Sequence, residues 1–139
     1  MLELNSLKHA IDSMSELLNR TYDTKLMTSL DEVTQNGLKA GVVQNFEFTY
    51  ELCWKFMKRW LENNVGASYV DGVSRKELFR IAAENLLIED VERWMEYHKA
   101  RNETSHLYDE DVADLVFEAA TDFIHDAKKL LANLEARND

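Results

Sequence analysis

The stretch that decides the fold is residues 46–61, FEFTYELCWKFMKRWL, near the middle of the chain. When its residues are placed about 100° apart, as in an α-helix, the apolar side chains gather on one broad arc. The arc consists of Phe46, Tyr50, Cys53, Trp54, Phe56, Met57, Trp60 and Leu61. The remaining stripe consists of Glu47, Phe48, Glu51, Lys55 and Lys58, at spacings that allow Glu-to-Lys pairs. We therefore predict a long helix from about Leu38 to Asn63.

The width of this arc bears on assembly. A helix that is apolar over more than half its circumference is normally covered from two sides. We therefore expect it to line both the core of a helical bundle and the interface of a homodimer. Cys53 lies within the arc and is the only cysteine, which predicts a buried thiol and no internal disulfide.

Upstream, apolar residues recur every three or four positions from Leu4 to about Arg20, which predicts a first helix. Ser29 and Glu32 have the spacing of a capping box for a short helix, with a plausible stop at residues 36–37, Asn-Gly. The same segment can instead be the lead-in to the long helix.

Downstream, helix N-cap residues mark the starts of three more helices. Ser74, three residues before Glu77, predicts a helix through about Leu86. Asp90 predicts a helix that ends near residues 101–102, and Asp109 predicts a last helix of about six turns.

The composition supports a helical fold. The chain has 139 residues, no proline and four glycines, so little in the sequence interrupts long helices. We predict a single all-α domain over residues 1–139, an up-and-down bundle of four to five helices that dimerises. The tail from about residue 135 is expected to fray.

Several classes of function are disfavoured. The formal net charge of −10 repels nucleic acid in general, so no DNA binding is expected and any RNA contact must be local. A signal peptide, a membrane span and the common nucleotide-binding loops are not recognised, which predicts a cytoplasmic protein without membrane association. The histidines lack zinc-site spacing, and residues 109–111, Asp-Glu-Asp, fit a helix cap better than a magnesium site, so no metal or cofactor is expected.

Residues 101–108, RNETSHLY, crowd polar side chains between two predicted helices. Arginine can hold a phosphate through two parallel hydrogen bonds, and histidine can give or take a proton near neutral pH. Arg101 and His106 therefore suit metal-free cleavage of RNA by its own 2′-hydroxyl, completed across a dimer because one histidine does not readily serve both sides of the displacement. In the purely structural alternative, Arg101 pairs with Glu47 or Glu51, His106 satisfies backbone groups, and Tyr108 packs as a capping aromatic.

The spacing Arg101-x4-His106-x-Tyr108 resembles the Arg-x4-His-x-Tyr motif of HEPN-domain toxins of the HepT type. Residues 46–55, FEFTYELCWK, and residues 101–110, RNETSHLYDE, are similar to the nucleotidyltransferase substrate-binding family. These blocks and the helices around them cover most of the chain.

The resemblance implies a HEPN-like bundle that dimerises and works with a separately encoded small nucleotidyltransferase of the MntA type, as a toxin and its antitoxin. It assigns metal-independent RNase activity to Arg101 and His106 with support from Asn102. It also makes Tyr108 the residue that the partner adenylylates from ATP. Residues on the long helix are candidates for a groove or interface: Glu47, Phe48, Glu51 and Lys55.

Two other functions remain open from the sequence. In the older family interpretation the bundle is a non-catalytic subunit that binds a substrate or nucleotide for the nucleotidyltransferase. In a third, the chain is a structural adaptor whose motif only stabilises the dimer and the partner interface.

Overall fold

A computed structural model describes residues 1–138, which are mainly helical and contain no strand. Its α-helices are α1 (Asn5–Thr21), α2 (Thr24–Ser29), α3 (Glu32–Leu61), α4 (Ala67–Val70), α5 (Arg75–Glu84), α6 (Val91–Asn102) and α7 (Glu110–Ala136). A π-helical turn, η1 (Glu62–Gly66), follows α3, and a 3-10 turn, η2 (Glu103–His106), follows α6. The all-α helical bundle predicted from the sequence is confirmed.

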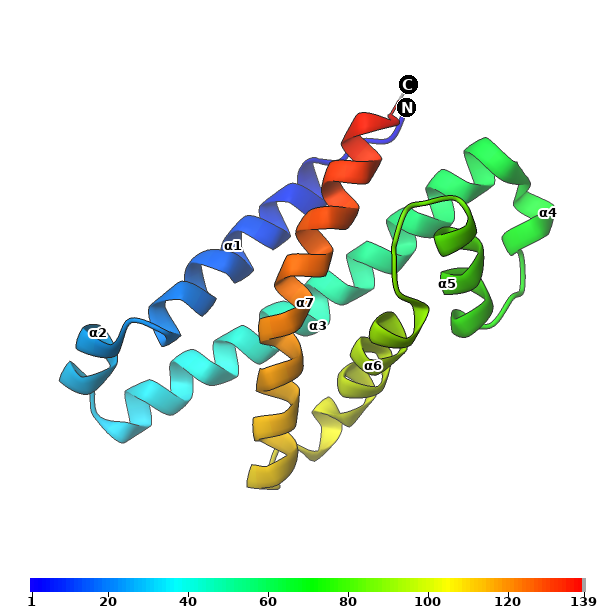
Figure 1. Ribbon diagram of the computed structural model, residues 1–139. Coiled ribbons are helices and arrows are strands. Elements are labelled where there is room, and N and C mark those ends of the chain that lie inside the picture. The colour runs from blue at the N-terminus through cyan, green and yellow to red at the C-terminus, as the bar shows by residue number, and fades with distance from the viewer. Residues whose placement is uncertain (139) are drawn as a thin grey trace.

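The long helix α3 is the spine of the bundle (Figure 1). Helix α1 runs back along its first half, α5 and α6 pack against its second half, and α7 crosses between these two groups. The chain ends meet, because the backbone N–H of Leu2 donates to Asn138 Oδ1 at 2.7 Å and Asn138 Nδ2 donates to the Leu2 carbonyl at 2.8 Å. The tail that was expected to fray thus continues α7 to Ala136, while Asp139 lies outside the described residues.

The core is one continuous cluster of apolar side chains with Phe123 of α7 near its centre. The Phe123 ring contacts the rings of Phe46, Tyr50, Trp94 and Tyr97, with centroids 5.1–6.4 Å away. Edge-to-face contacts of this kind add to the hydrophobic stabilisation. The aromatic residues of α3 thereby join the two halves of the bundle.

The apolar arc of α3 is covered almost entirely by the chain itself. All of its members are buried except Trp54, which is half-buried, and the buried Cys53 is as predicted. The chain alone therefore covers this arc, because α1, α5, α6 and α7 pack around it, and the expected homodimer stays a prediction. Phe48, on the opposite stripe, stays 61% exposed.

The helix starts predicted at Ser74, Asp90 and Asp109 are confirmed, because each side chain accepts a hydrogen bond from a backbone N–H of its own first turn. The capping box at Ser29 is wrong. Asp31 caps α3 instead, accepting from the Thr34 N–H at 2.8 Å, and the Thr34 side chain together with this N–H lowers the pKa of the Asp31 carboxyl.

The long helix also starts earlier than predicted. Residues 36–37, the proposed stop, lie inside α3, and nothing within 4 Å would obstruct a side chain at Gly37. Among residues 1–138 no ion pair links the glutamates of the α3 stripe to its lysines, so the expected Glu-to-Lys pairs do not form.

Within residues 1–138, no helix has the length and apolar character needed to cross a membrane.

Candidate functional site

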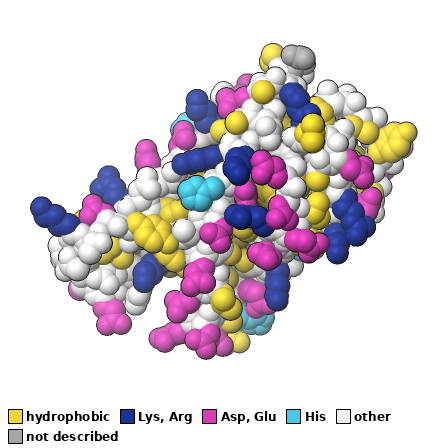
Figure 2. Space-filling model, in the orientation of Figure 1, with side chains coloured by type: hydrophobic (Ala, Val, Ile, Leu, Met, Phe, Trp, Pro, Cys, Tyr) yellow, Lys and Arg dark blue, Asp and Glu magenta, His cyan; other side chains and the backbone are white. Residues whose placement is uncertain are grey.

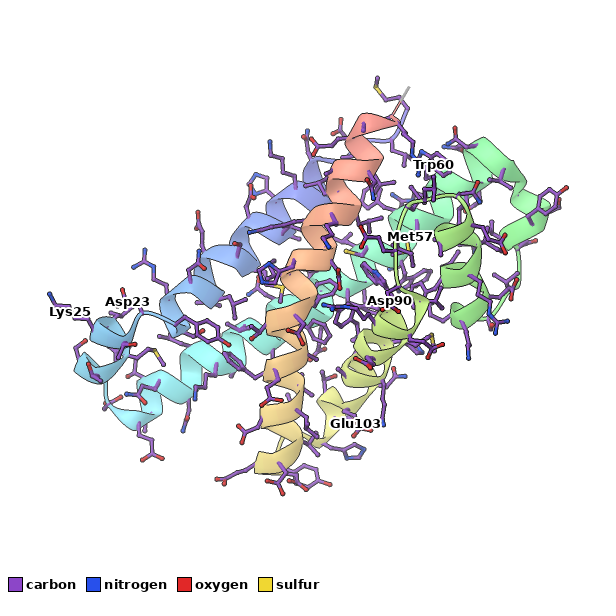
Figure 3. The ribbon with its side chains drawn as sticks, viewed as in Figure 1. Asp23, Lys25, Met57, Trp60, Asp90 and Glu103 are labelled. Atoms are coloured by element: carbon purple, nitrogen blue, oxygen red, sulfur yellow. The ribbon has the colours of Figure 1, made fainter. Side chains whose placement is uncertain are left out.

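The segment 101–108 forms the connection from α6 to α7 at one end of the bundle, where Figure 3 labels Glu103. It contains the last residues of α6 and the turn η2, and it ends just before Asp109, the cap of α7. The Asp109 N–H donates to the His106 carbonyl at 3.1 Å, and Asp109 Oδ1 accepts from the Asp111 N–H at 2.9 Å. These bonds hold a short connection between two helices, a rigid place from which to present side chains.

Arg101 points from α6 toward α3. Its Nε lies 3.4 Å from Glu51 Oε1, and its Nη1 donates to Thr104 Oγ1 at 3.4 Å. The ion pair lacks hydrogen-bond alignment, so the buried Nε–H has no hydrogen-bond partner among residues 1–138. Glu51 was one of the two partners allowed by the structural alternative. A buried donor without an aligned hydrogen-bond partner is uncommon, and here the Nε–H lies beside the Glu51 carboxylate.

Asn102 belongs to a second set of contacts that sequence reasoning missed. Its Nδ2 lies 3.4 Å from His98 Nε2, and His98 Nδ1 lies 2.8 Å from the hydroxyl of Tyr50 on α3. The same hydroxyl accepts from Nη1 of Arg75 on α5 at 3.3 Å. Because Arg75 donates to this oxygen, the tyrosine proton is free to be donated to His98 Nδ1.

The protonation of this network follows from its surroundings. Burial lowers the pKa of His98 below its usual 6.5, and the charges of Arg75 and Arg101 lower it further against the opposing charge of Glu51. Burial raises the pKa of Tyr50 to about 12. Neutral His98 is therefore an acceptor at Nδ1 for a tyrosine that keeps its proton.

His106 and Tyr108 form a separate, exposed pair beyond the end of α6. The Tyr108 hydroxyl lies 3.5 Å from His106 Nδ1, and the two rings meet edge to face with centroids 6.0 Å apart. Tyr108 is 85% exposed. The chain therefore places Arg101 against α3, Asn102 beside His98 on α6, and His106 and Tyr108 at an open tip, with no hydrogen bond between the first two residues and the last two in residues 1–138.

The candidate residues on α3 lie on the stripe that faces away from the core. Glu51 Oε2 accepts from Trp54 Nε1 at 3.0 Å, so this carboxylate serves both Trp54 and Arg101. Lys55 is exposed, with its Nζ 5.8 Å from the centre of the Trp54 ring. Glu47 is half-buried, and neither it nor the exposed Phe48 contacts the motif through a hydrogen bond within the described chain.

Two hollows flank the motif without being lined by Arg101, His106 or Tyr108. One, of about 400 Å³, lies between α6 and α7, and Glu103 is part of its rim. The other, of about 380 Å³, lies between α3 and α7, and Leu107 is part of its wall. The motif thus occupies the ridge between them.

Charge is unevenly distributed around this ridge. Figure 2 shows Asp and Glu side chains crowded over the first part of α7, and Lys and Arg side chains over α5. Within residues 1–138 no group of three His, Cys, Asp or Glu side chains could hold a metal ion.

Comparison with known proteins identifies the family. Residues 2–136 match the family model described as nucleotidyltransferase substrate binding protein like. The chain belongs to the nucleotidyltransferase substrate-binding family. Over 138 residues the chain is 34% identical to a Haemophilus influenzae protein named probable ribonuclease HepT. The match covers 99% of this chain and 94% of that protein. This similarity places the chain with the HepT-like members of the family.

Solved structures in this comparison support the fold of the family. A Haemophilus influenzae structure, described as the fold of a substrate binding domain of a nucleotidyltransferase, matches with a TM-score of 0.90 at 33% identity, over 96% of this chain and 99% of that one. A Thermus thermophilus structure matches with a TM-score of 0.73 at 24% identity, over 92% and 98% of the respective chains, and supports the fold alone.

Proposed function

We propose that this HepT-like protein is a metal-independent endoribonuclease in which Arg101 holds the scissile phosphate and His106 transfers protons. The observation that carries the proposal is the similarity to the probable ribonuclease HepT along nearly the whole chain. The site adds a partly exposed arginine, paired with Glu51, and an exposed histidine on the same short connection. Asn102, held beside His98, is the supporting polar contact.

The proposed chemistry needs no cofactor. A base takes the proton of a ribose 2′-hydroxyl, whose oxygen attacks the adjacent phosphorus; the bond to the 5′-oxygen breaks and that oxygen accepts a proton from an acid. The products are a 2′,3′-cyclic phosphate and a 5′-hydroxyl. Arg101 offsets the charge that builds on the phosphate oxygens during this step.

A second copy of the chain would complete the site. One imidazole cannot readily take and deliver protons on opposite sides of one phosphorus atom, and His106 is not in contact with Arg101 within one chain. A homodimer that brings two open tips together would supply two histidines and two arginines to one RNA strand.

The first test is RNA cleavage by purified protein in EDTA. Because loss of a general acid or base typically slows a reaction by about 10²- to 10⁴-fold, His106→Ala should reduce the rate by that much while the helical circular dichroism stays unchanged. The matched control is His125→Ala, which removes an exposed histidine on α7 and should keep the rate. Equal rates for all three proteins would exclude the role given to His106.

We further propose that an MntA-type nucleotidyltransferase partner inactivates the protein by adenylylating Tyr108. The 85% exposed phenol can reach a partner's active site, and a phosphate placed there would add negative charge beside His106. With the partner and ATP, the protein should gain the mass of adenylyl groups and lose RNase activity, and Tyr108→Phe should show neither change. Tyr22→Phe, at a phenol that is 58% exposed, should behave as the wild type; unchanged labelling of Tyr108→Phe would locate the modification elsewhere.

The alternative is a non-catalytic subunit that binds a substrate for the nucleotidyltransferase. It is favoured by the description of the solved Haemophilus influenzae structure as a substrate binding domain. This alternative predicts no RNA cleavage by the chain in EDTA, and turnover only when the nucleotidyltransferase is added. The His106→Ala assay therefore separates the two functions.

A further inference from the structure

Arg75, the first residue of α5, is in an unusual position for a cation. It is half-buried, its guanidinium lies 3.6 Å from the centre of the Trp54 ring, and its Nη1 donates to the Tyr50 hydroxyl. In a chain of net charge −10, no carboxylate among residues 1–138 forms an ion pair with it. The start of a helix carries partial positive charge, which disfavours a cation and favours an anion at this point.

The stacking fixes the plane of the guanidinium and leaves donors unused. Arginine that stacks on an aromatic ring retains N–H groups at its edge for a carboxylate or a phosphate. Only one of these groups, the Nη1 that donates to Tyr50, is used in a hydrogen bond with the described chain. The remaining donors suit a bidentate anionic ligand.

The hydroxyl oxygen of Tyr50 connects Arg75 to the side chains next to the motif. The Tyr50 hydroxyl contacts both Arg75 Nη1 at 3.3 Å and His98 Nδ1 at 2.8 Å, and His98 in turn lies 3.4 Å from Asn102. Arg101, the residue before Asn102, has the buried Nε–H without a partner. The guanidinium groups of Arg75 and Arg101 both oppose protonation of this histidine, and Glu51, paired with Arg101, is the carboxylate that enters this network.

We propose that Arg75, stacked on Trp54, forms a phosphate-binding site next to the Arg101 motif, and that it holds a phosphate ester of an RNA strand or of a nucleotide. In the RNA case, which rests on the proposed function, Arg75 binds a phosphate neighbouring the one that is cleaved and so sets the path of the strand across α3. In the nucleotide case, it binds the phosphate of the ligand directly.

The test measures binding without cleavage, by NMR of the indole N–H groups. The probes are a short 2′-O-methyl oligoribonucleotide, ATP in EDTA, and inorganic phosphate. The Trp54 indole should shift on titration because its ring carries Arg75, whereas Trp60 and Trp94, which are buried, serve as internal references. The resonance is assigned with Trp54→Phe.

Arg75→Gln should weaken binding of the effective probe by about tenfold or more, the usual effect of losing hydrogen bonds to a charged group. The matched control is Arg80→Gln on the same helix, whose arginine is exposed and paired with Glu77; it makes the same change in net charge and should alter affinity by less than about twofold. A shift with the oligonucleotide alone identifies RNA as the source of the phosphate, and a shift with ATP identifies a nucleotide.

Two results would overturn the proposal: no Trp54 shift with any probe in the wild-type protein, or equal weakening by Arg75→Gln and Arg80→Gln. The first does not depend on whether a variant folds. The 2′-O-methyl group blocks the attacking oxygen, so binding is measured whether or not the protein is an RNase. Failure of the His106→Ala assay together with a Trp54 shift would reject cleavage and keep the phosphate site.

Discussion

His98 lies on the side of α6 that faces α3, where burial and two guanidinium groups oppose its protonation. The structure satisfies this neutral imidazole with the Tyr50 hydroxyl at one nitrogen and places Asn102 at the other. Asn102 is thus connected through His98 to Tyr50 of α3 and Arg75 of α5, which lie outside the 101–108 segment.

His98 should make the stability of the protein depend on pH. Because its pKa is lower in the folded chain than the usual 6.5, the unfolded chain binds more protons as the pH falls through 6.5, and stability drops until His98 is also protonated in the folded state. Above pH 6.5 this contribution is fully present. Urea unfolding on both sides of pH 6.5 should therefore show a smaller decrease on acidification for His98→Gln than for the wild type. His125→Gln, at an exposed site, should retain the wild-type dependence; if it lost the same amount as His98→Gln, the assignment to His98 would fail.

Site residues that lie close together in the sequence could be predicted, and site residues whose contacts join distant parts of the chain could not. The Arg101 to Tyr108 segment was found because its side chains are close in sequence. Tyr50 and His98 are separated by 48 positions, and each looked like one more inward residue of an amphipathic helix. The available signal was that an inward-facing phenol and imidazole both need polar partners, but one sequence does not say which groups pair.

At the scale of helices, the starts were easier to predict than the ends. Ser74, Asp90 and Asp109 work through hydrogen bonds within their own first turns, so their effect is visible in sequence. Residues 36–37 failed as a stop because a glycine inside a helix costs only about 1 kcal/mol, which the packing of the rest of α3 offsets. The end of α5 is less expected still: Leu86 has a φ of 62°, a conformation that favours glycine.

Leu86 offers a stabilising substitution. Its N–H donates to the Ala83 carbonyl and the Leu87 N–H donates to the Ala82 carbonyl, which together close α5 with a left-handed residue. Leu86 is 75% exposed, so its removal loses little burial, and Leu86→Gly should raise the free energy of unfolding by up to about 1 kcal/mol by relieving the backbone. Leu87→Gly, at the fully buried neighbour, should instead lower it by about 2–5 kcal/mol. Chemical denaturation measures both, and a destabilised Leu86→Gly would contradict the account of this helix end.

At the scale of the whole molecule, an acidic protein limits where RNA can bind. Acidic side chains crowd the first part of α7 beside the motif, whereas Arg75 has unused donors beside Trp54 of α3. Because the apolar arc of α3 is buried by the chain itself, the proposed dimer must use other surfaces, and the exposed Phe48 and Tyr108 are two candidates for them.

The most direct test of the central claim, metal-free cleavage by the 2′-hydroxyl, is the product formed from one RNA in EDTA with and without a single 2′-O-methyl group at the cleaved nucleotide. The account predicts that the unmodified RNA gives a 2′,3′-cyclic phosphate and a 5′-hydroxyl end, and that the methylated RNA is not cleaved at that position. Cleavage of the methylated RNA at the same rate, or cleavage only after a divalent metal is added, would contradict it.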